Sequence, residues 1–283
     1  MRYASYLRDG SARTAALIDG KWYDVGTETI VSRLQAGIDL SQTESLARGG
    51  EFDLDEVTLL PLIATPPKIF CIGLNYLDHA AESPYKDRPS YPAVFPRYAT
   101  SLVGHGQPIV RPQVSDQLDF EGELVAVIGK GGRHIRKADA LSHVAGYSIF
   151  NEGSIRDYQF KSPQWTVGKN FDDTGAFGPV LVTADELPPG AHGLKIETRL
   201  NGTVMQRGNT ADLIFPVAEL IATLSEAITL QPGDVIVTGT PAGIGWARKP
   251  PVFMKDGDVC EIEIEGIGTL RNPVRDEVHA AAS

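Results

Sequence analysis

The stretch Asp119-Phe120-Glu121-Gly122-Glu123 leads directly into Leu124-Val125-Ala126-Val127-Ile128. In a β-strand, side chains two positions apart share a face, so Asp119, Glu121 and Glu123 are expected to point the same way. The apolar run that follows has no polar face, which is typical of a strand buried on both sides. Acidic side chains entering a buried strand repel one another unless a cation neutralises them, and hard divalent cations prefer oxygen ligands. The stretch therefore predicts a buried strand, and a metal site at its start is one interpretation of the carboxylates.

The alternative interpretation is a solvated strand face. The segment Cys260-Glu261-Ile262-Glu263-Ile264-Glu265 illustrates it, because its acids alternate regularly with apolar residues. We interpret that segment as structural. At 119–123 the alternation stops after Glu123, so this segment differs from the structural one, and the residues alone leave both interpretations open.

Length and composition describe an ordinary globular chain. Its 283 residues are 42% hydrophobic and 22% charged, which allows one large domain, or a large domain and a small one. The net charge of −10 argues against nucleic-acid partners. Charged residues interrupt positions 1–20, and no apolar run is long enough for a membrane span, so we expect neither a signal peptide nor a membrane partner. Two cysteines, Cys71 and Cys260, fit a reducing compartment, and we expect a cytoplasmic protein.

Turn signals and periodicity predict a β-rich α+β fold. Residues 1–65 are expected to form a small N-terminal α+β domain, and Pro66-Pro67 marks the break before a strand-rich domain over 66–283. Two helices are expected in the second part, over Asn75–Glu82 and Pro216–Leu230. The strands expected there are Lys68–Ile72, Ala93–Phe95, Leu124–Ile128, Gly146–Phe150, Pro179–Val182, Lys195–Leu200, Asp234–Thr238 and Val259–Glu265.

Three further polar clusters are candidates for chemistry. His79 and Glu82 would be neighbours on a helix, as a general base for water requires, although an incidental ion pair has the same spacing. In the polar stretch Asn151–Gln159, Glu152 could add an oxygen ligand for a metal. A capped helix start has the same kind of polar sequence, so that interpretation stays open. Lys169 lies in the segment Gly168–Asp173. Its side chain could supply positive charge to an oxyanion, or the segment could simply be a surface turn. The loop Gly239–Gly245 could bind a carboxylate through backbone N–H groups.

Taken in order, these motifs resemble the fumarylacetoacetate hydrolase family. The resemblance runs from about Pro67 to Val274, and the N-terminal unit looks like the small domain that many bacterial members carry. Each motif alone is weak, but seven in this order are specific for the family. They are the segments Lys68–Tyr76 with His79 and Glu82, Asp119–Glu123, Arg156–Gln159, Gly168–Asp172, Gly208–Thr210, Gln231–Ile236 and Thr238–Gly245.

The resemblance implies a mixed β-roll catalytic domain that forms a homodimer and binds one Mg²⁺ or Mn²⁺ per subunit. The family's metal ligands fall on Glu121, Glu123 and Glu152. The third ligand is commonly Asp in the family, and the longer Glu152 should shift the metal or change its coordination. A second departure is Arg97, in a stretch where relatives often have Lys.

The resemblance also implies roles for other residues. His79 and Glu82 would be a catalytic, water-activating dyad on a mobile lid of about Leu77–Arg88. Lys169 would be catalytic and, with Gln159, would contact the substrate oxyanion. Arg156, from the same motif as Gln159, would bind substrate, and Gly239 with Thr240 would hold a substrate carboxylate.

The leading prediction is a divalent-metal-dependent hydrolase that cleaves a C–C bond in a β-diketo acid of the acylpyruvate or fumarylpyruvate type, in aromatic-compound catabolism. The substrate would be a small 2-oxo acid. Alternatives within the family are an oxaloacetate decarboxylase and a 2-hydroxyhepta-2,4-diene-1,7-dioate isomerase type of enzyme. A catalytically silent dimeric binding protein is a more distant alternative, and the presence of all the catalytic residue types argues against it.

Overall fold

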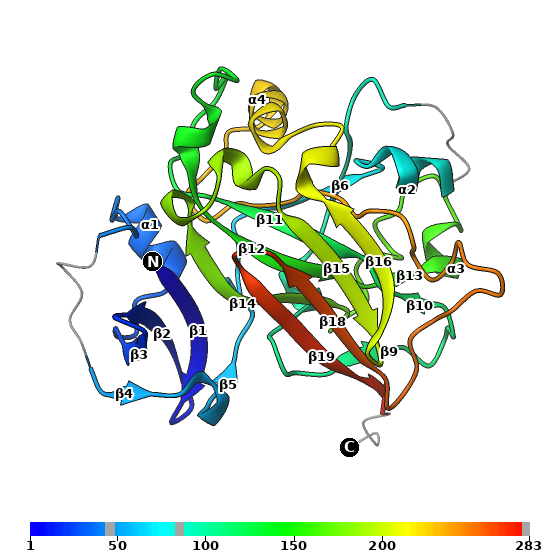
Figure 1. Ribbon diagram of the computed structural model, residues 1–283, viewed down its shortest axis with the longest axis horizontal. Coiled ribbons are helices and arrows are strands. Elements are labelled where there is room, and N and C mark those ends of the chain that lie inside the picture. The colour runs from blue at the N-terminus through cyan, green and yellow to red at the C-terminus, as the bar shows by residue number, and fades with distance from the viewer. Residues whose placement is uncertain (43–48, 83–87, 279–283) are drawn as a thin grey trace.

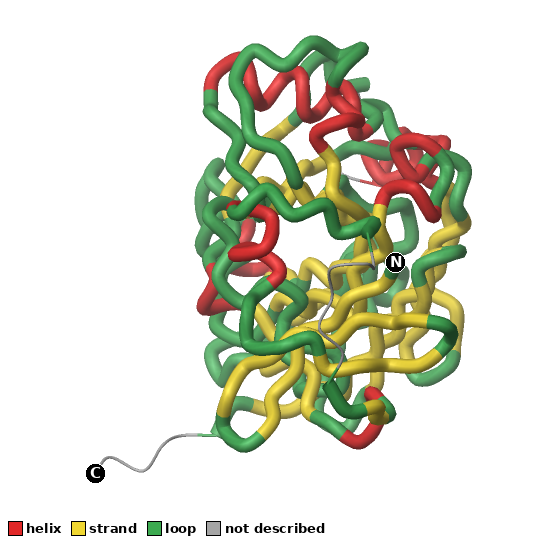
Figure 2. The backbone as a smooth tube through the Cα atoms, turned by 90° about the vertical axis from the view of Figure 1, so that its left-hand side faces the viewer, coloured by secondary structure: helices red, strands yellow, loops and turns green. Residues whose placement is uncertain are grey.

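The computed structural model describes residues 1–42, 49–82 and 88–278. Strands form the interior and short helices lie around them (Figures 1 and 2). The predicted mixed β protein with few helices is confirmed. Within the described ranges, no helix is long and apolar enough to cross a membrane. The α-helices are α1 (Ile30–Gln35), α2 (Leu77–Glu82), α3 (Arg156–Gln159) and α4 (Val217–Ala227).

The larger sheet takes strands from the N-terminal segment and from the middle of the chain, as far as residue 237. Two short strands join it at the side, β5 (Thr58–Leu59) on β1 (Arg2–Arg8) and β8 (Leu102–Val103) on β14 (Gly175–Thr183). Its order is β4 (Glu51–Phe52), β3 (Lys21–Asp24), β2 (Ser11–Ile18), β1 (Arg2–Arg8), β14 (Gly175–Thr183), β12 (Val144–Glu152), β11 (Gly122–Ile128), β17 (Val235–Val237), β6 (Ile69–Gly73) and β7 (Ala93–Pro96).

The N-terminal strands are part of this sheet. Strand β1 pairs antiparallel with β14, with Tyr3 opposite Leu181, so β1–β3 lie beside β14 at one side of the molecule (Figure 1). A domain boundary near residue 65 stays a prediction.

A smaller sheet packs on one face of the larger one. Its strands are β16 (Thr203–Asn209), β15 (Lys195–Leu200), β18 (Val259–Ile264), β19 (Gly268–Asp276) and β9 (Ile109–Arg111). A short ladder joins β10 (Leu118–Asp119) to β13 (Ser154–Ile155). Single turns of 3₁₀ helix occur at η1 (Leu54–Glu56), η2 (Ala99–Ser101), η3 (Ala140–His143), η4 (Ala184–Glu186), η5 (Pro189–Ala191) and η6 (Thr210–Asp212).

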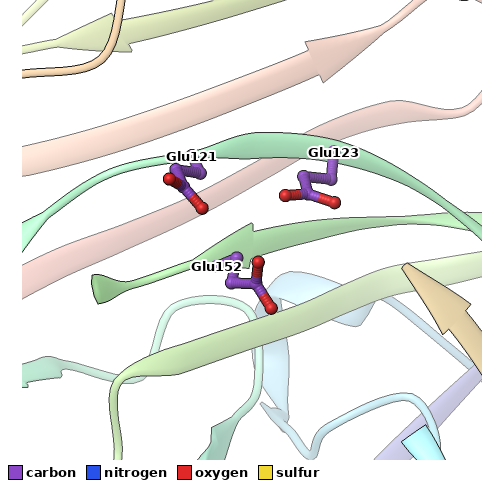
Figure 3. Close-up of side chains that lie close together, drawn as sticks. All are labelled: Glu121, Glu123 and Glu152. Atoms are coloured by element: carbon purple, nitrogen blue, oxygen red, sulfur yellow. The ribbon is translucent and has the colours of Figure 1, made fainter. Parts of the chain in front are cut away.

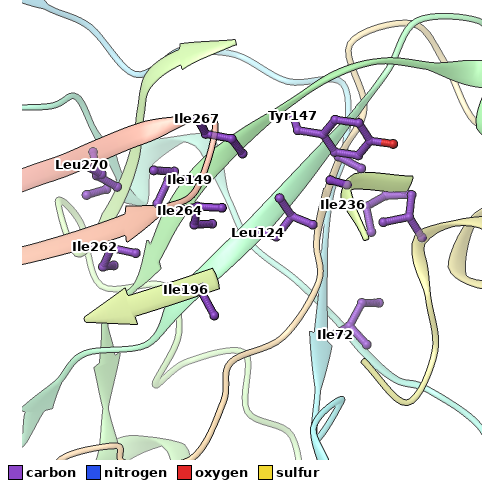
Figure 4. Packing of buried hydrophobic residues seen from close by; sticks show 14 of the residues in the cluster. Ile72, Leu124, Tyr147, Ile149, Ile196, Ile236, Ile262, Ile264, Ile267 and Leu270 are labelled. Carbon is purple, nitrogen blue, oxygen red and sulfur yellow. The ribbon is translucent and has the colours of Figure 1, made fainter. Parts of the chain in front are cut away.

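Strand β11 is buried on both faces, as its sequence predicts. Leu124, Ala126 and Ile128 face the smaller sheet, where Leu124 packs among isoleucines of β15, β18 and β12 (Figure 4). Val125 and Val127 face the opposite way, into a second core with residues of β1, β2 and α1. The alternating β18 has one buried and one wetter face, so its acids are structural, as predicted.

Two helix boundaries differ from the prediction. Helix α4 ends at Ala227 rather than Leu230, because Ile228 is already extended and Leu230 forms a bridge with Gly132. Helix α2 begins at Leu77 rather than Asn75, because Leu74 has φ +58 and the Asn75 side chain binds other segments.

Asn75 clamps three segments together behind the start of α2. Its side chain is fully buried, its Nδ2 donates to Thr238 O (2.7 Å) and Phe215 O (3.1 Å), and its Oδ1 accepts from Phe215 N (2.7 Å). These bonds tie α2 to the loop after β17 and to the segment before α4.

Asn75→Ala is expected to lower the free energy of unfolding by about 2–4 kcal/mol, because it leaves buried backbone groups of Phe215 and Thr238 without partners. Urea denaturation followed by circular dichroism measures this loss. Ser142→Ala is the matched control, since its exposed hydroxyl bonds only the nearby Asp139 carbonyl. Equal stability of the Asn75→Ala protein and the wild type would show that the clamp is dispensable.

Candidate active site

Three glutamates converge where the start of β11 pairs with the end of β12 in the larger sheet. Glu121 comes directly before β11 and Glu123 is its second residue, and the pairing of Gly122 with Asn151 places Glu152 of β12 opposite Glu121. One carboxylate oxygen from each residue lies within 4.8 Å of one oxygen from each of the other two, and all three residues are buried (Figure 3). The predicted ligand set is therefore brought together.

Asp119 is not part of this cluster, and the expectation that it shares a face and a role with the glutamates is wrong. The strand is interrupted at Phe120 and Glu121, so Asp119 belongs to β10. Its oxygens accept from Gly245 N (2.7 Å), Trp246 N (2.9 Å) and Arg156 Nε (2.8 Å). Asp119 anchors the glycine-rich loop and the guanidinium beside the site.

Buried cations contact the glutamates. Lys169 Nζ lies 2.6 Å from Glu121 Oε2 and 3.2 Å from Glu152 Oε2, and Arg156 donates to Glu121 Oε1 at 2.7 Å. Burial alone would raise the pKa of Glu121, but Arg156 and Lys169 outweigh it and hold this pKa well below its usual range. Burial would likewise lower the pKa of Lys169, but Glu121 and Glu152 raise it, so the ammonium stays charged.

Glu123 has a different environment. Its Oε2 accepts from Gly239 N at 2.5 Å, and burial followed by the charges of Glu152 and Glu121 raises its pKa well above the usual range. Among the described residues, Glu152 Oε1 is a buried acceptor with no hydrogen-bond partner. Crowded carboxylates, an unpartnered oxygen and an all-oxygen donor set fit a divalent cation such as Mg²⁺ or Mn²⁺.

Arg97 lies behind Glu152. Its guanidinium is fully buried and donates to Ser101 Oγ, Gly153 O and Thr174 Oγ1, and one nitrogen lies 3.9 Å from Glu152 Oε1. Gly175 makes room for it, since a Cβ there would come within 2.6 Å of Arg97 Nε.

The cavity contains most of the predicted residues. Arg156 NH1 donates to Gln159 Oε1 at 2.8 Å, which turns the Gln159 amide nitrogen away from Arg156 and leaves it as a donor. Since Arg156 is also bonded to Asp119 and Glu121, its contacts fit positioning, and its predicted binding of substrate stays a prediction. The predicted residues that line the cavity are His79, Glu121, Glu123, Glu152, Arg156, Gln159, Lys169 and Thr240.

Glu82 and Gly239 are the predicted residues outside this lining. Both oxygens of Glu82 accept from Gly243 N at 3.0 Å, whereas Glu82 Oε2 lies 3.6 Å from His79 Nδ1. Within the described residues, His79 Nδ1 has no hydrogen-bond partner. The predicted lid includes α2, but residues 83–87 lie outside the described residues and its mobility stays a prediction.

The Thr240 hydroxyl is engaged inside the protein. It donates to Gly122 O (3.0 Å) and accepts from Gln206 Nε2 (2.8 Å), while Gln206 Oε1 accepts from Gly122 N (3.0 Å). The Gly239 N–H is likewise taken by Glu123. The predicted binding of a substrate carboxylate by Gly239 and Thr240 therefore stays a prediction. Gln206, which sequence reasoning missed, ties the smaller sheet to both sides of this site.

Sequence reasoning also missed the apolar walls of the cavity. Two of the chain's three tryptophans, Trp165 and Trp246, line it. Trp246 directly follows the motif Thr238–Gly245, and Trp165 lies just before the motif Gly168–Asp172. Both motifs were considered for their polar residues and glycines alone. The apolar residues that line the cavity are Ile72, Leu74, Phe95, Phe160, Trp165, Ile244 and Trp246.

A family model, fumarylacetoacetate (FAA) hydrolase C-terminal, matches residues 68–275. The chain belongs to the fumarylacetoacetate hydrolase family. It is 45% identical over 221 residues to the human mitochondrial oxaloacetate tautomerase FAHD2A, covering 77% of this chain and 70% of that protein. It is 46% identical over 227 residues to the oxaloacetate tautomerase YisK of Bacillus subtilis, covering 79% and 75%.

Solved structures agree along almost the full length. The fumarylacetoacetate hydrolase from the psychrophilic Exiguobacterium antarcticum is 36% identical, with a TM-score of 0.85 over 98% of this chain and 100% of that one. A 5-carboxymethyl-2-hydroxymuconate delta-isomerase from Mycobacterium smegmatis is 32% identical, with a TM-score of 0.80 over 99% and 100%. The protein is thus an enzyme of this superfamily, and its similarity extends to isomerases as well as hydrolases.

Glu121→Gln or Glu123→Gln is expected to abolish stabilisation by Mn²⁺, because ligand-linked stability disappears with the ligands. At about 100 times the dissociation constant, the wild type should gain about 2.7 kcal/mol. Thermal unfolding with and without MnCl₂ measures the gain. Glu263→Gln on β18, an exposed glutamate in the alternating segment, should keep it. A full Mn²⁺ response in both site variants would contradict the metal site.

Glu152→Asp is expected to leave the fold intact and to change the preference between Mg²⁺ and Mn²⁺, because the shorter side chain withdraws one oxygen from the cluster. Titration calorimetry with each ion gives the ratio of the two dissociation constants. The same ratio in the variant and the wild type would mean that side-chain length at this position does not set the coordination.

Proposed function

We propose that the protein is an oxaloacetate tautomerase, which interconverts the enol and keto forms of oxaloacetate. Curated relatives that are 42–46% identical over 77–79% of this chain bear that name, which supports the isomerase alternative better than acylpyruvate hydrolysis. A cytoplasmic location, a homodimer and a place in aromatic-compound catabolism stay predictions.

The contacts of Glu82 are the structural observation that supports tautomerisation most directly. Hydrolysis needs a base that activates water, and a carboxylate bonded to His79 would raise the basicity of that base. Here Glu82 binds the Gly243 N–H, and its distance of 3.6 Å from His79 Nδ1 is too long for a hydrogen bond. Tautomerisation needs no water, since a proton only leaves the O2 hydroxyl and another is added at C3.

The residues of the cavity can perform this proton exchange. His79 lies in the lining, and an imidazole is a common general acid or base in enzymes, so it would exchange the proton at C3. Lys169, held charged by Glu121 and Glu152, would stabilise negative charge on O2, and the free amide hydrogens of Gln159 would orient the same oxygen.

Glu121, Glu123 and Glu152 would hold one Mg²⁺ or Mn²⁺ ion per subunit, which when bound supplies positive charge to the oxygens of the 2-oxo acid. The apolar walls around the polar groups exclude bulk water, so these charges act more strongly than they would in solvent.

Hydrolysis of a β-diketo acid is the second candidate. The similarity to the Exiguobacterium fumarylacetoacetate hydrolase supports it. Decarboxylation of oxaloacetate also remains open, because it accumulates the same negative charge on O2. These activities differ in products: tautomerisation releases nothing, whereas decarboxylation releases pyruvate and CO₂, and cleavage of an acylpyruvate releases pyruvate and a second acid.

His79→Ala is expected to reduce the ketonisation of enol-oxaloacetate by about 10²–10⁴-fold, because it removes the general acid. Glu82→Gln should reduce it far less, since no water has to be activated. The assay follows the enol absorbance with Mg²⁺ or Mn²⁺ present and measures pyruvate release in parallel. His192→Ala is the matched control, because this histidine is exposed and outside the cavity.

The outcomes separate the candidates. Rapid pyruvate release from an acylpyruvate, lost equally in the His79→Ala and Glu82→Gln proteins, would replace the tautomerase with the hydrolase. Pyruvate release from oxaloacetate that outpaces ketonisation would identify a decarboxylase. No turnover of either substrate would count against both.

A further inference from the structure

The cavity joins a charged end to aromatic walls. Lys169 Nζ, which contacts Glu121, lies 5.2 Å from the centre of the Phe95 ring. Trp165 packs edge-on against the same ring, at 5.5 Å between centroids and 72° between planes. Trp165 also lines the cavity beside Phe95, so its indole borders the space in which a bound 2-oxo acid would lie.

The indole of Trp165 packs against the backbone of Gly73, which has no side chain. A Cβ on Gly73 would lie 2.3 Å from Cζ3 of Trp165 and 3.0 Å from its Cη2. Gly73 is the last residue of strand β6, and its backbone conformation would accept an alanine. The position requires glycine because a side chain would clash with the indole. The contact fixes how deeply the indole enters the cavity.

The backbone of Trp165 is tied to the charged end as well. Its carbonyl accepts from Lys169 N at 3.2 Å, so one turn places both the ammonium and the indole. The Phe95 ring lies next to both the Lys169 ammonium and the Trp165 indole. The distance between these two groups is therefore constrained by the turn and by the Phe95 ring.

We propose that Trp165, seated on Gly73, is the wall that limits the length of the 2-oxo acid that this cavity accepts. The inference rests on the proposed function for its ligand class, a short 2-oxo acid with its oxo-acid end at Lys169 and the glutamates. A fixed indole rejects additional methylenes because it cannot move off the Phe95 ring without losing the contact with Gly73. In apolar pockets one methylene typically changes discrimination by about 10–200-fold.

The test is binding of pyruvate, 2-oxobutanoate, 2-oxopentanoate and 2-oxohexanoate, by titration calorimetry with saturating Mg²⁺. In the wild type, affinity should fall beyond a short chain. In Trp165→Ala the longest acids should bind roughly 10-fold tighter or more than they bind the wild type, whereas pyruvate should bind equally to both. Tyr91→Ala, which removes an exposed aromatic ring outside the cavity, should leave the profile unchanged. An identical chain-length profile in Trp165→Ala would overturn the proposal.

Gly73→Ala gives a second, independent readout. With Trp165 present it should alter the chain-length profile, because the new methyl group displaces the indole. In the Gly73→Ala, Trp165→Ala double variant the same methyl group has space, so the profile should match that of Trp165→Ala alone. An equal effect of Gly73→Ala in both backgrounds would contradict the contact. Because binding requires no turnover, a protein with this profile but without ketonisation activity would refute the tautomerase and leave the wall standing.

Discussion

Glu121, Glu123 and Glu152 are buried side by side, and the repulsion between their carboxylates has to be balanced for this part of the chain to fold. The balancing cations come from separate segments: Arg156 from α3, Lys169 from the turn before β14, and Arg97 from the segment after β7. Arg156 and Arg97 are held by further hydrogen bonds to their own surroundings, and Lys169 Nζ lies 5.2 Å from the centre of the Phe95 ring. Ion pairs with the three glutamates therefore bring together three segments that are distant in the sequence.

The same region couples the two sheets. Gly122, between two of the glutamates, would clash with Thr198 of the smaller sheet if it carried a Cβ, at 2.3 Å from its hydroxyl oxygen. Gln206 of that sheet uses both ends of its amide on Gly122 and on the Thr240 loop. The smaller sheet is thus a support for the site as well as a hydrophobic cover.

Sequence patterns predicted what depends on local periodicity and on ordered motifs. The two-residue spacing of Glu121 and Glu123, followed by an apolar run, was enough to predict a buried strand with ligands at its start, and the motif order supplied Glu152. The same spacing misled at Asp119, because the strand is interrupted there to bring its carboxylate to the backbone of Gly245 and Trp246. Strands β16 and β19 and the continuation of the sheet through β1 were not predicted, because pairing between distant segments leaves no local pattern. Nor can motifs shared by hydrolases, decarboxylases and isomerases tell which proton or bond is moved, since all need the same oxygen stabilised.

The placement of the tryptophans makes intrinsic fluorescence a reporter of ligand binding. Trp165 and Trp246 line the cavity, and Trp22 lies on β3 among the N-terminal strands. Ligand entry changes the polarity around the first two indoles, whereas the third keeps its surroundings. Intrinsic fluorescence should therefore contain one ligand-sensitive component and one steady component. Occupancy of the unlabelled chain could be followed in real time against this internal reference.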